Sequence, residues 1–122
     1  ARNDRCPFRV LTMQQMSPVQ VKEWLDDAAA GKAAMPFLLD VREPWEFDTC
    51  HIAGSVALPM HLVATRLDEF ERERPMVVIC HHGGRSAQVG YFLEQHGFSQ
   101  ITNLQGGVAA WAIQVDPAMP TY

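Results

Sequence analysis

The sequence has few cysteines and no long apolar run. Its 122 residues include three cysteines, Cys6, Cys50 and Cys80, and no CxxC pair. This pattern fits neither a disulfide framework nor a zinc ribbon, so we expect free thiols, a reducing cytoplasmic compartment, and no bound metal or other cofactor. No apolar stretch is long enough to cross a bilayer, and none has the form of a signal-peptide core. The sequence therefore does not predict a membrane partner.

The chain also lacks an excess of positive charge. Lys and Arg number 10 against 14 Asp and Glu, and the net charge of −4 disfavours nucleic acid as a partner. The apolar content of 48% and the charged content of 20% are typical of a globular domain. We therefore predict one domain over residues 1–122, with a loosely ordered segment at 1–7 and an extended tail at 114–122. Nothing in the sequence indicates an oligomeric state.

Apolar runs alternate with helical patterns along the chain. Ser17, Pro18 and Gln20 predict a capped helix that ends at Gly31. Further helices are predicted at 61–74, 86–96 and 106–113, and strands at 8–12, 36–41, 55–59, 76–80 and 101–103. Strands that alternate with helices indicate an α/β domain with a mostly parallel sheet.

The segment after the strand at 76–80 carries the residues best suited to chemistry. Ligands bind beyond the carboxyl ends of parallel strands, and Cys80 stands at such an end. A thiol becomes nucleophilic when it is ionised, and inward-pointing amides, a helix N-terminus and cations all favour the ionised form. The residues that supply these features are His81, His82, Gly83, Gly84, Arg85 and Ser86.

Three motifs, in this order, resemble the single-domain rhodanese sulfurtransferases over nearly the whole chain. They are LLDVREPWEFDTCHIAGSVALP at 38–59, CHHGGRS at 80–86 and NLQGGVAAW at 103–111. The resemblance implies a rhodanese-like α/β fold, in which helices flank both faces of a five-stranded, mostly parallel sheet. It also implies that the loop after the central strand wraps around the catalytic sulfur.

The same resemblance implies a thiosulfate sulfurtransferase in which Cys80 is the nucleophile. The Cys80 thiolate would attack the outer sulfur of a small sulfur-containing anion such as thiosulfate, or of a persulfide, and carry that sulfur as its own persulfide. Cyanide in an assay, or a small thiol or sulfur-acceptor protein in the cell, would then accept it. The loop amides from His81 to Ser86 would stabilise the anionic sulfur, and Arg85 would support it and contact departing sulfite. Asp40 and Arg42 would brace the loop.

Two other functions stay open beside this one. The first is a module that relays persulfide sulfur for a partner protein or simply docks it. The second is phosphatase or arsenate reductase chemistry, for which related proteins use a loop that is one residue longer between cysteine and arginine. Four residues separate Cys80 from Arg85, and the smaller ring of amides favours a sulfur atom over a tetrahedral phosphate.

Cys50 departs from the family pattern, which has glycine before the histidine. If the backbone is left-handed there, cysteine costs roughly 1 kcal/mol; a second redox thiol is a further hypothesis for this position.

Tyr122 and the tail around it carry no signal. The remaining notable positions are interpreted as scaffold or packing residues: Trp24, Trp45, His51, Gly106, Gly107 and Trp111.

Overall fold

Five parallel strands form one sheet in the computed structural model, which describes residues 13–122. The strand order is β1-β5-β4-β2-β3, so β4 lies at the centre. The predicted parallel α/β architecture is confirmed. The strand predicted at 8–12 and the segment at 1–7 lie outside the described residues. The strands are β1 (Gln14–Met16), β2 (Phe37–Asp40), β3 (Val56–Ala57), β4 (Met76–Ile79) and β5 (Ile101–Leu104).

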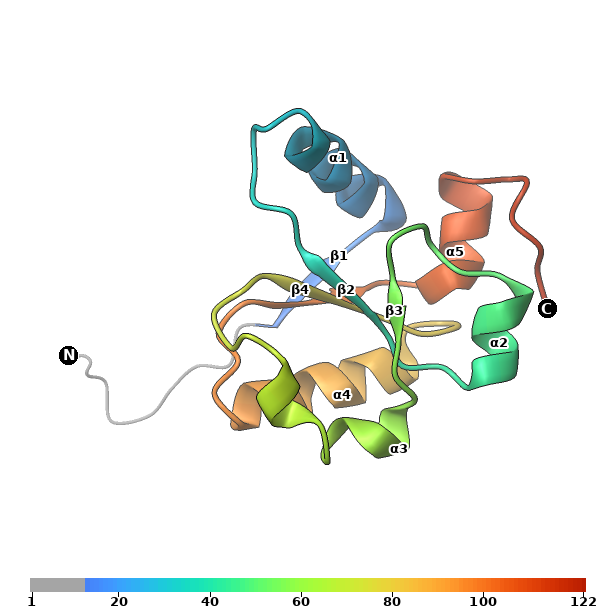
Figure 1. Cartoon of the computed structure of the whole chain (residues 1–122). Coiled ribbons are helices and arrows are strands. Elements are labelled where there is room, and N and C mark those ends of the chain that lie inside the picture. Colours follow the sequence, from blue (N-terminus) through green and yellow to red (C-terminus); the bar gives the residue numbers. More distant parts are fainter. Residues whose placement is uncertain (1–12) are drawn as a thin grey trace.

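Helices cover both faces of this sheet. In Figure 1, α1 and α5 lie on one side of the strands, and α3 and α4 lie on the other. None of the helices within residues 13–122 is long and apolar enough to span a membrane. The helices are α1 (Pro18–Ala29), α2 (Pro44–Thr49), α3 (Met60–Val63), the 3₁₀ helix η1 (Leu67–Glu69), α4 (Gly84–Gln95) and α5 (Gly107–Gln114).

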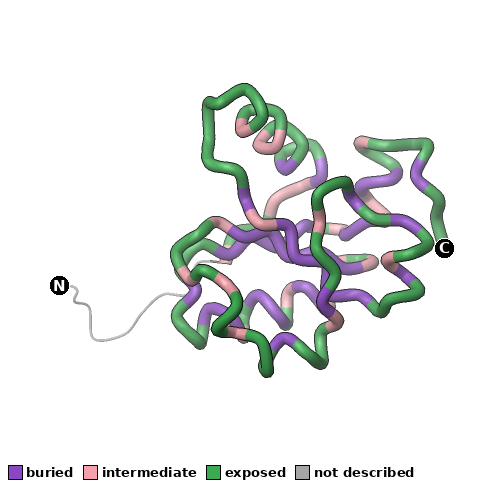
Figure 2. The backbone as a smooth tube through the Cα atoms, in the orientation of Figure 1, coloured by how far each residue is buried: buried purple, intermediate pink, exposed green. Residues whose placement is uncertain are grey.

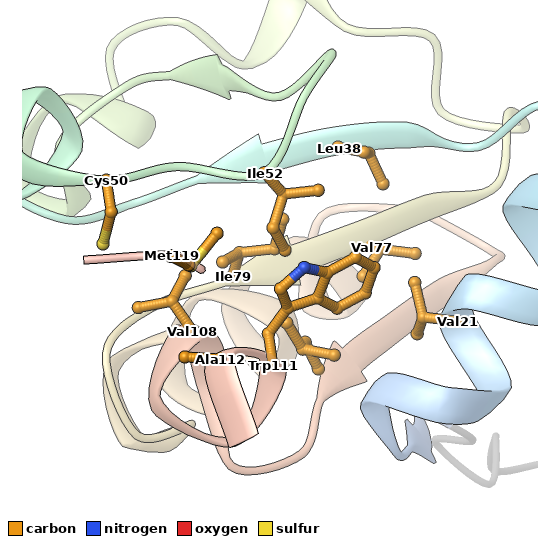
Figure 3. Close-up of a cluster of buried hydrophobic side chains, with 11 residues drawn as sticks. Val21, Leu38, Cys50, Ile52, Val77, Ile79, Val108, Trp111, Ala112 and Met119 are labelled. Carbon is orange, nitrogen blue, oxygen red and sulfur yellow. The ribbon is translucent and has the colours of Figure 1, made fainter. Parts of the chain in front are cut away.

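Each face of the sheet has its own buried apolar cluster, because successive strand residues point to opposite faces. Val77 and Ile79 of β4 pack with Trp111 of α5 on one face (Figure 3). Val78 and Cys80 pack with Leu93 of α4 on the other face. Figure 2 shows the mostly buried strands β2, β4 and β5 at the centre, with exposed residues on the outer sides of the helices. Apolar side chains therefore cover both faces of the central strand where it leads into the predicted loop.

The predicted helix start at Ser17 is confirmed. The Ser17 hydroxyl accepts a hydrogen bond from the Gln20 amide, and the Gln20 side chain accepts one from the Ser17 amide at 2.8 Å. These reciprocal bonds satisfy two backbone donors that a helix N-terminus otherwise leaves free. Gly31, with φ of +79°, follows the helix end as predicted.

The continuous helix predicted at 61–74 is wrong. The segment forms α3 and η1 instead, and the two are separate. The Thr65 hydroxyl donates to the Leu62 carbonyl at 2.8 Å, a local bond that competes with regular helix, and Arg66 adopts φ of −123°. Val63 is nevertheless buried in the core. The apolar spacing therefore identifies the buried residue correctly although the helix is interrupted.

Candidate active site

Cys80 directly follows β4, at the carboxyl edge of the sheet and beside the end of β2. The neighbouring strand holds this point in register, because the Val41 amide donates to the Ile79 carbonyl at 2.9 Å. Cys80 is only 1% exposed. The side chain of Cys80 is therefore almost completely covered.

Within residues 13–122, two groups lie within hydrogen-bonding distance of the Cys80 sulfur. The Gly83 amide donates to Sγ at 3.0 Å, and the Ser86 Oγ lies 3.3 Å from Sγ. Gly83 has φ of +102°, a conformation that side-chain-bearing residues rarely adopt. Gly84, by contrast, is the first residue of α4, so the helix begins two residues before the predicted start. Within residues 13–122, Gly83 supplies the one loop amide that is hydrogen-bonded to Sγ, and the fuller ring of amides stays a prediction.

Asn103 on β5 fixes the orientation of the Ser86 hydroxyl. Ser86 Oγ donates to Asn103 Oδ1 at 2.5 Å, while Asn103 Nδ2 donates to Gln15 Oε1 and to the Gly83 carbonyl. While Cys80 is a thiol, the Ser86 hydroxyl donates to Asn103 and its oxygen is free to accept from the thiol; once Cys80 is ionised, the same hydroxyl can donate to the sulfur instead. A buried serine and asparagine thus connect the sulfur to two strands of the sheet.

The first turn of α5 holds the carbonyls of the loop. The amides of Val108 and Ala109 donate to the carbonyls of Cys80 and His81 at 2.9 and 3.1 Å. Gly107 makes this approach possible: its φ is +62°, and a Cβ there would lie 2.3 Å from the Cys80 oxygen. Gly107 was predicted to be a packing residue, and the structure shows that it packs closely against the backbone carbonyls of Cys80 and His81.

Asp40 and Arg42 form a fully buried ion pair, with 2.7 Å between Asp40 Oδ2 and Arg42 Nη2. Arg42 also donates to the carbonyls of Cys50 at 2.6 Å and Glu46 at 3.2 Å. Burial alone would lower the Arg42 pKa, but hydrogen bonds to Asp40 and Tyr122 raise it above the ordinary value. The pair joins β2 to the segment around α2. That it also braces the active-site loop stays a prediction.

Arg85 is directed toward Glu46 on α2. Its Nη1 and Nη2 donate to Glu46 Oε1 and Oε2 at 2.7 and 2.9 Å, a bidentate pair. The Glu46 carboxylate is 4% exposed and also accepts from the Glu43 amide and the Tyr122 hydroxyl, each at 2.9 Å. The hydrogen bond from Arg85 is the main reason that the Glu46 pKa falls to about 2, although burial opposes the shift. The same bond raises the pKa of Arg85.

The C-terminal tail returns to the loop, and in Figure 1 it ends beside α2. The Tyr122 ring stacks on His81, with centroids 4.0 Å apart, and Trp45 contacts its edge. The Tyr122 hydroxyl accepts from Arg42 Nη1 at 2.8 Å and donates to Glu46 Oε2. Burial raises the pKa of Tyr122 to about 12. A hollow of about 170 Å³ lies between this tail, the loop and α5.

The histidines of the loop lie against each other, with ring centroids 3.9 Å apart. Burial, followed by the charge of His82, lowers the pKa of His81 and favours its neutral form near neutral pH. His51 stacks on Phe47, and its Nδ1 lies 2.9 Å from the Phe47 carbonyl, in line with the predicted scaffold role. Within the described residues, no group of three or more His, Cys, Asp or Glu side chains is placed to hold a metal ion.

Cys50 has an extended backbone with φ of −166°, so the left-handed strain considered for this position does not arise. Its side chain is buried.

Two side chains that bind the arginines of the site were not singled out by sequence reasoning. Glu46 lies inside the first motif, four residues after Arg42, and the motif is its only signal. Tyr122 has none, because its partners lie far away along the chain: 80 residues for Arg42 and 76 for Glu46.

Residues 17–114 match the rhodanese-like domain family. The chain belongs to that family. The thiosulfate sulfurtransferase GlpE of Pseudomonas aeruginosa is 32% identical over 100 residues, which cover 82% of this chain and 84% of that protein. The probable adenylyltransferase/sulfurtransferase MoeZ of Mycobacterium tuberculosis is 37% identical over 109 residues, which cover 88% of this chain but only 26% of MoeZ.

Solved rhodanese-like structures agree with this assignment. A rhodanese-related protein from Thermoplasma volcanium shares 30% identity at a TM-score of 0.71, covering 84% of this chain and 93% of that one. The Staphylococcus saprophyticus protein SSP1007 also shares 30% identity, at a TM-score of 0.74, covering 84% of this chain and 97% of that one. The rhodanese-like fold predicted from the motifs is confirmed.

Proposed function

We propose that this rhodanese-like chain transfers a sulfane sulfur from thiosulfate or a persulfide to a thiophilic acceptor through a persulfide on Cys80. The observation that carries the proposal is the position of the Cys80 sulfur at the end of the central strand, in contact with the Gly83 amide and the Ser86 hydroxyl. An amide donor of this kind stabilises a negatively charged sulfur. The name of GlpE, a thiosulfate sulfurtransferase, supports the same reaction class.

The reaction divides into two displacements at sulfur. In the first, the Cys80 thiolate attacks the outer sulfur of the donor, the sulfur–sulfur bond of the donor breaks, and sulfite or a thiolate leaves with the electron pair. In the second, the acceptor attacks the outer sulfur of the Cys80 persulfide. Cyanide would leave as thiocyanate, and the Cys80 thiolate would be restored.

The loop residues have separate roles in these steps. The Gly83 amide holds the inner sulfur, and further amides between His81 and Ser86 would receive the outer sulfur of the persulfide. α5 supports this arrangement by binding the loop carbonyls from behind. The buried Asp40–Arg42 pair fixes the adjacent segment.

Thiocyanate formation from thiosulfate and cyanide, or from glutathione persulfide and cyanide, tests the proposal. We expect turnover with at least one donor, its loss in Cys80→Ser, and its retention in the matched variant Cys50→Ser. Turnover that survives Cys80→Ser, or no turnover with either donor from a folded protein, would refute the proposed function.

A further inference from the structure

The guanidinium groups around the active-site loop are already paired with carboxylates. Arg85 is held by Glu46, and Arg42 is held by Asp40. Lys22, on α1, pairs with Asp26 instead. Within residues 13–122, the local charge that a small dianion would meet at the loop is therefore close to neutral, apart from the thiolate itself.

Glu46 is unusually well fixed as the partner of Arg85. Its two oxygens accept four hydrogen bonds: two from Arg85, one from the Glu43 amide and one from the Tyr122 hydroxyl. A carboxylate with this many donors stays ionised and does not rotate freely. The positive charge of Arg85 is therefore matched by a fixed negative charge before any substrate binds.

The Tyr122 hydroxyl keeps Glu46 in this position. It lies between Arg42 Nη1 and Glu46 Oε2, accepting from the first and donating to the second. Without this oxygen, Arg42 would lack one acceptor and would draw the Glu46 carboxylate toward itself. Part of the bidentate contact with Arg85 would then be lost.

Apolar side chains lie beside the active-site loop. The hollow beside the loop is lined by Ile113 and Tyr122, and Trp45 stands against the Tyr122 ring. Ile113 is 81% exposed and Trp45 is 61% exposed. These surfaces can bury the carbon portion of a donor, which thiosulfate does not have.

We infer that the site selects an organic persulfide over thiosulfate, with Glu46 as the specificity-determining residue and Tyr122 as the residue that positions it. This inference rests on the proposed function of Cys80. The Cys80 thiolate attacks the outer sulfur of R–S–SH, the sulfur–sulfur bond of the donor breaks, and the leaving thiolate takes the proton to become R–SH. The reacting group of a persulfide brings at most one negative charge, whereas thiosulfate brings two to a site whose guanidinium groups are occupied.

Sulfur loading of Cys80 by thiosulfate and by the persulfide of 2-mercaptoethanol, which has no charged group besides the persulfide, followed by intact mass, tests the inference. In Glu46→Gln, Arg85 keeps its charge without a compensating carboxylate. We expect the second-order rate constant with thiosulfate to rise about tenfold, the scale of a hydrogen bond to a charged group, while the constant with the persulfide changes less than about twofold. The matched control Glu94→Gln replaces another buried glutamate, near the far end of α4. It should leave both constants unchanged.

Two further measurements keep the inference testable if Glu46→Gln does not fold. Tyr122→Phe retains the aromatic ring and should shift the donor ratio in the same direction by a smaller factor, whereas Tyr91→Phe should not. In the unmodified chain, thiosulfate loading should not slow as ionic strength rises, because no unpaired guanidinium attracts the dianion. An unchanged donor ratio in folded Glu46→Gln or in Tyr122→Phe, or loading that slows with salt, would overturn the inference alone. Failure of both donors to load Cys80 would instead overturn the proposed function.

Discussion

At the Cys80 sulfur, a backbone amide and a side-chain hydroxyl act from the N-cap and the first turn of α4. The Gly83 amide is fixed by its left-handed backbone, and the Ser86 hydroxyl is fixed by Asn103. Because Ser86 is fully buried in the first turn of α4, its oxygen cannot be replaced by a water molecule from the bulk. The hydroxyl therefore contributes directly to the environment of the sulfur.

Ser86→Ala should slow sulfur loading of Cys80 about tenfold, because a buried hydrogen-bonding group beside the sulfur is lost and Asn103 is left without its donor. Quenched-flow sampling followed by intact mass spectrometry measures this rate. Ser99→Ala, at an exposed serine after α4, is the control and should load at the original rate. A loading rate in Ser86→Ala equal to that of the control would show that the hydroxyl is not used.

Sequence reasoning could identify the residues of the loop, because they are contiguous and their chemistry is local. It could not pair Arg85 with Glu46, since 39 residues separate them and either a substrate anion or a carboxylate satisfies a guanidinium. It also could not place Tyr122, whose contacts depend on the path of the tail after α5. The contribution of Asn103 is visible only when β5 lies beside β4.

Among the secondary-structure elements, α5 supports the site through its backbone, although none of its side chains is hydrogen-bonded to the Cys80 sulfur. Its first-turn amides bind the carbonyls of Cys80 and His81, which fixes the direction of the peptide units behind the nucleophile. The sequence predicts this helix and the close packing at Gly107. It does not predict which backbone atoms meet there, because that requires the three-dimensional path of the loop.

Gly107→Ala should destabilise the fold by about 2 kcal/mol or more and strongly reduce sulfur transfer, because the new Cβ would strike the Cys80 and His81 carbonyls. Chemical denaturation and the thiocyanate assay measure the two effects. Gly31→Ala is a matched control, since Gly31 also has positive φ but no atom lies near its Cβ position. It should cost about 1 kcal/mol and leave activity intact. Equal activity in both variants would contradict the role assigned to α5.

At the scale of the whole molecule, the network around Glu46 joins segments that are far apart in sequence. It connects α2, the start of α4 and the C-terminal tail through one buried carboxylate. The parallel sheet and its buried central strand follow from patterns that the sequence displays, whereas the order of the strands does not. The interruption between α3 and η1 does not follow from them either, because helical apolar spacing persists there while local hydroxyl bonding breaks the helix.

This network predicts a loss of stability in acid. The Glu46 pKa is about 2 in the folded chain against an ordinary value of 4.5, so the unfolded state takes up the proton first as pH falls. The contribution of this carboxylate to the free energy of unfolding, on the order of 3 kcal/mol, is therefore present above the ordinary pKa and lost as pH falls toward the folded-state pKa. Denaturant unfolding of the original chain and Glu46→Gln at several pH values measures it. The stability difference between them should shrink as the solution becomes acidic, and a constant difference would contradict the assignment.

The most direct test of the account is the intact mass of the protein after exposure to thiosulfate or glutathione persulfide. The account predicts a gain of one sulfur atom on the original chain, removal of that sulfur by cyanide, the same gain on Cys50→Ser, and no gain on Cys80→Ser. A folded protein that gains no sulfur from either donor, or a gain that persists in Cys80→Ser, would contradict it.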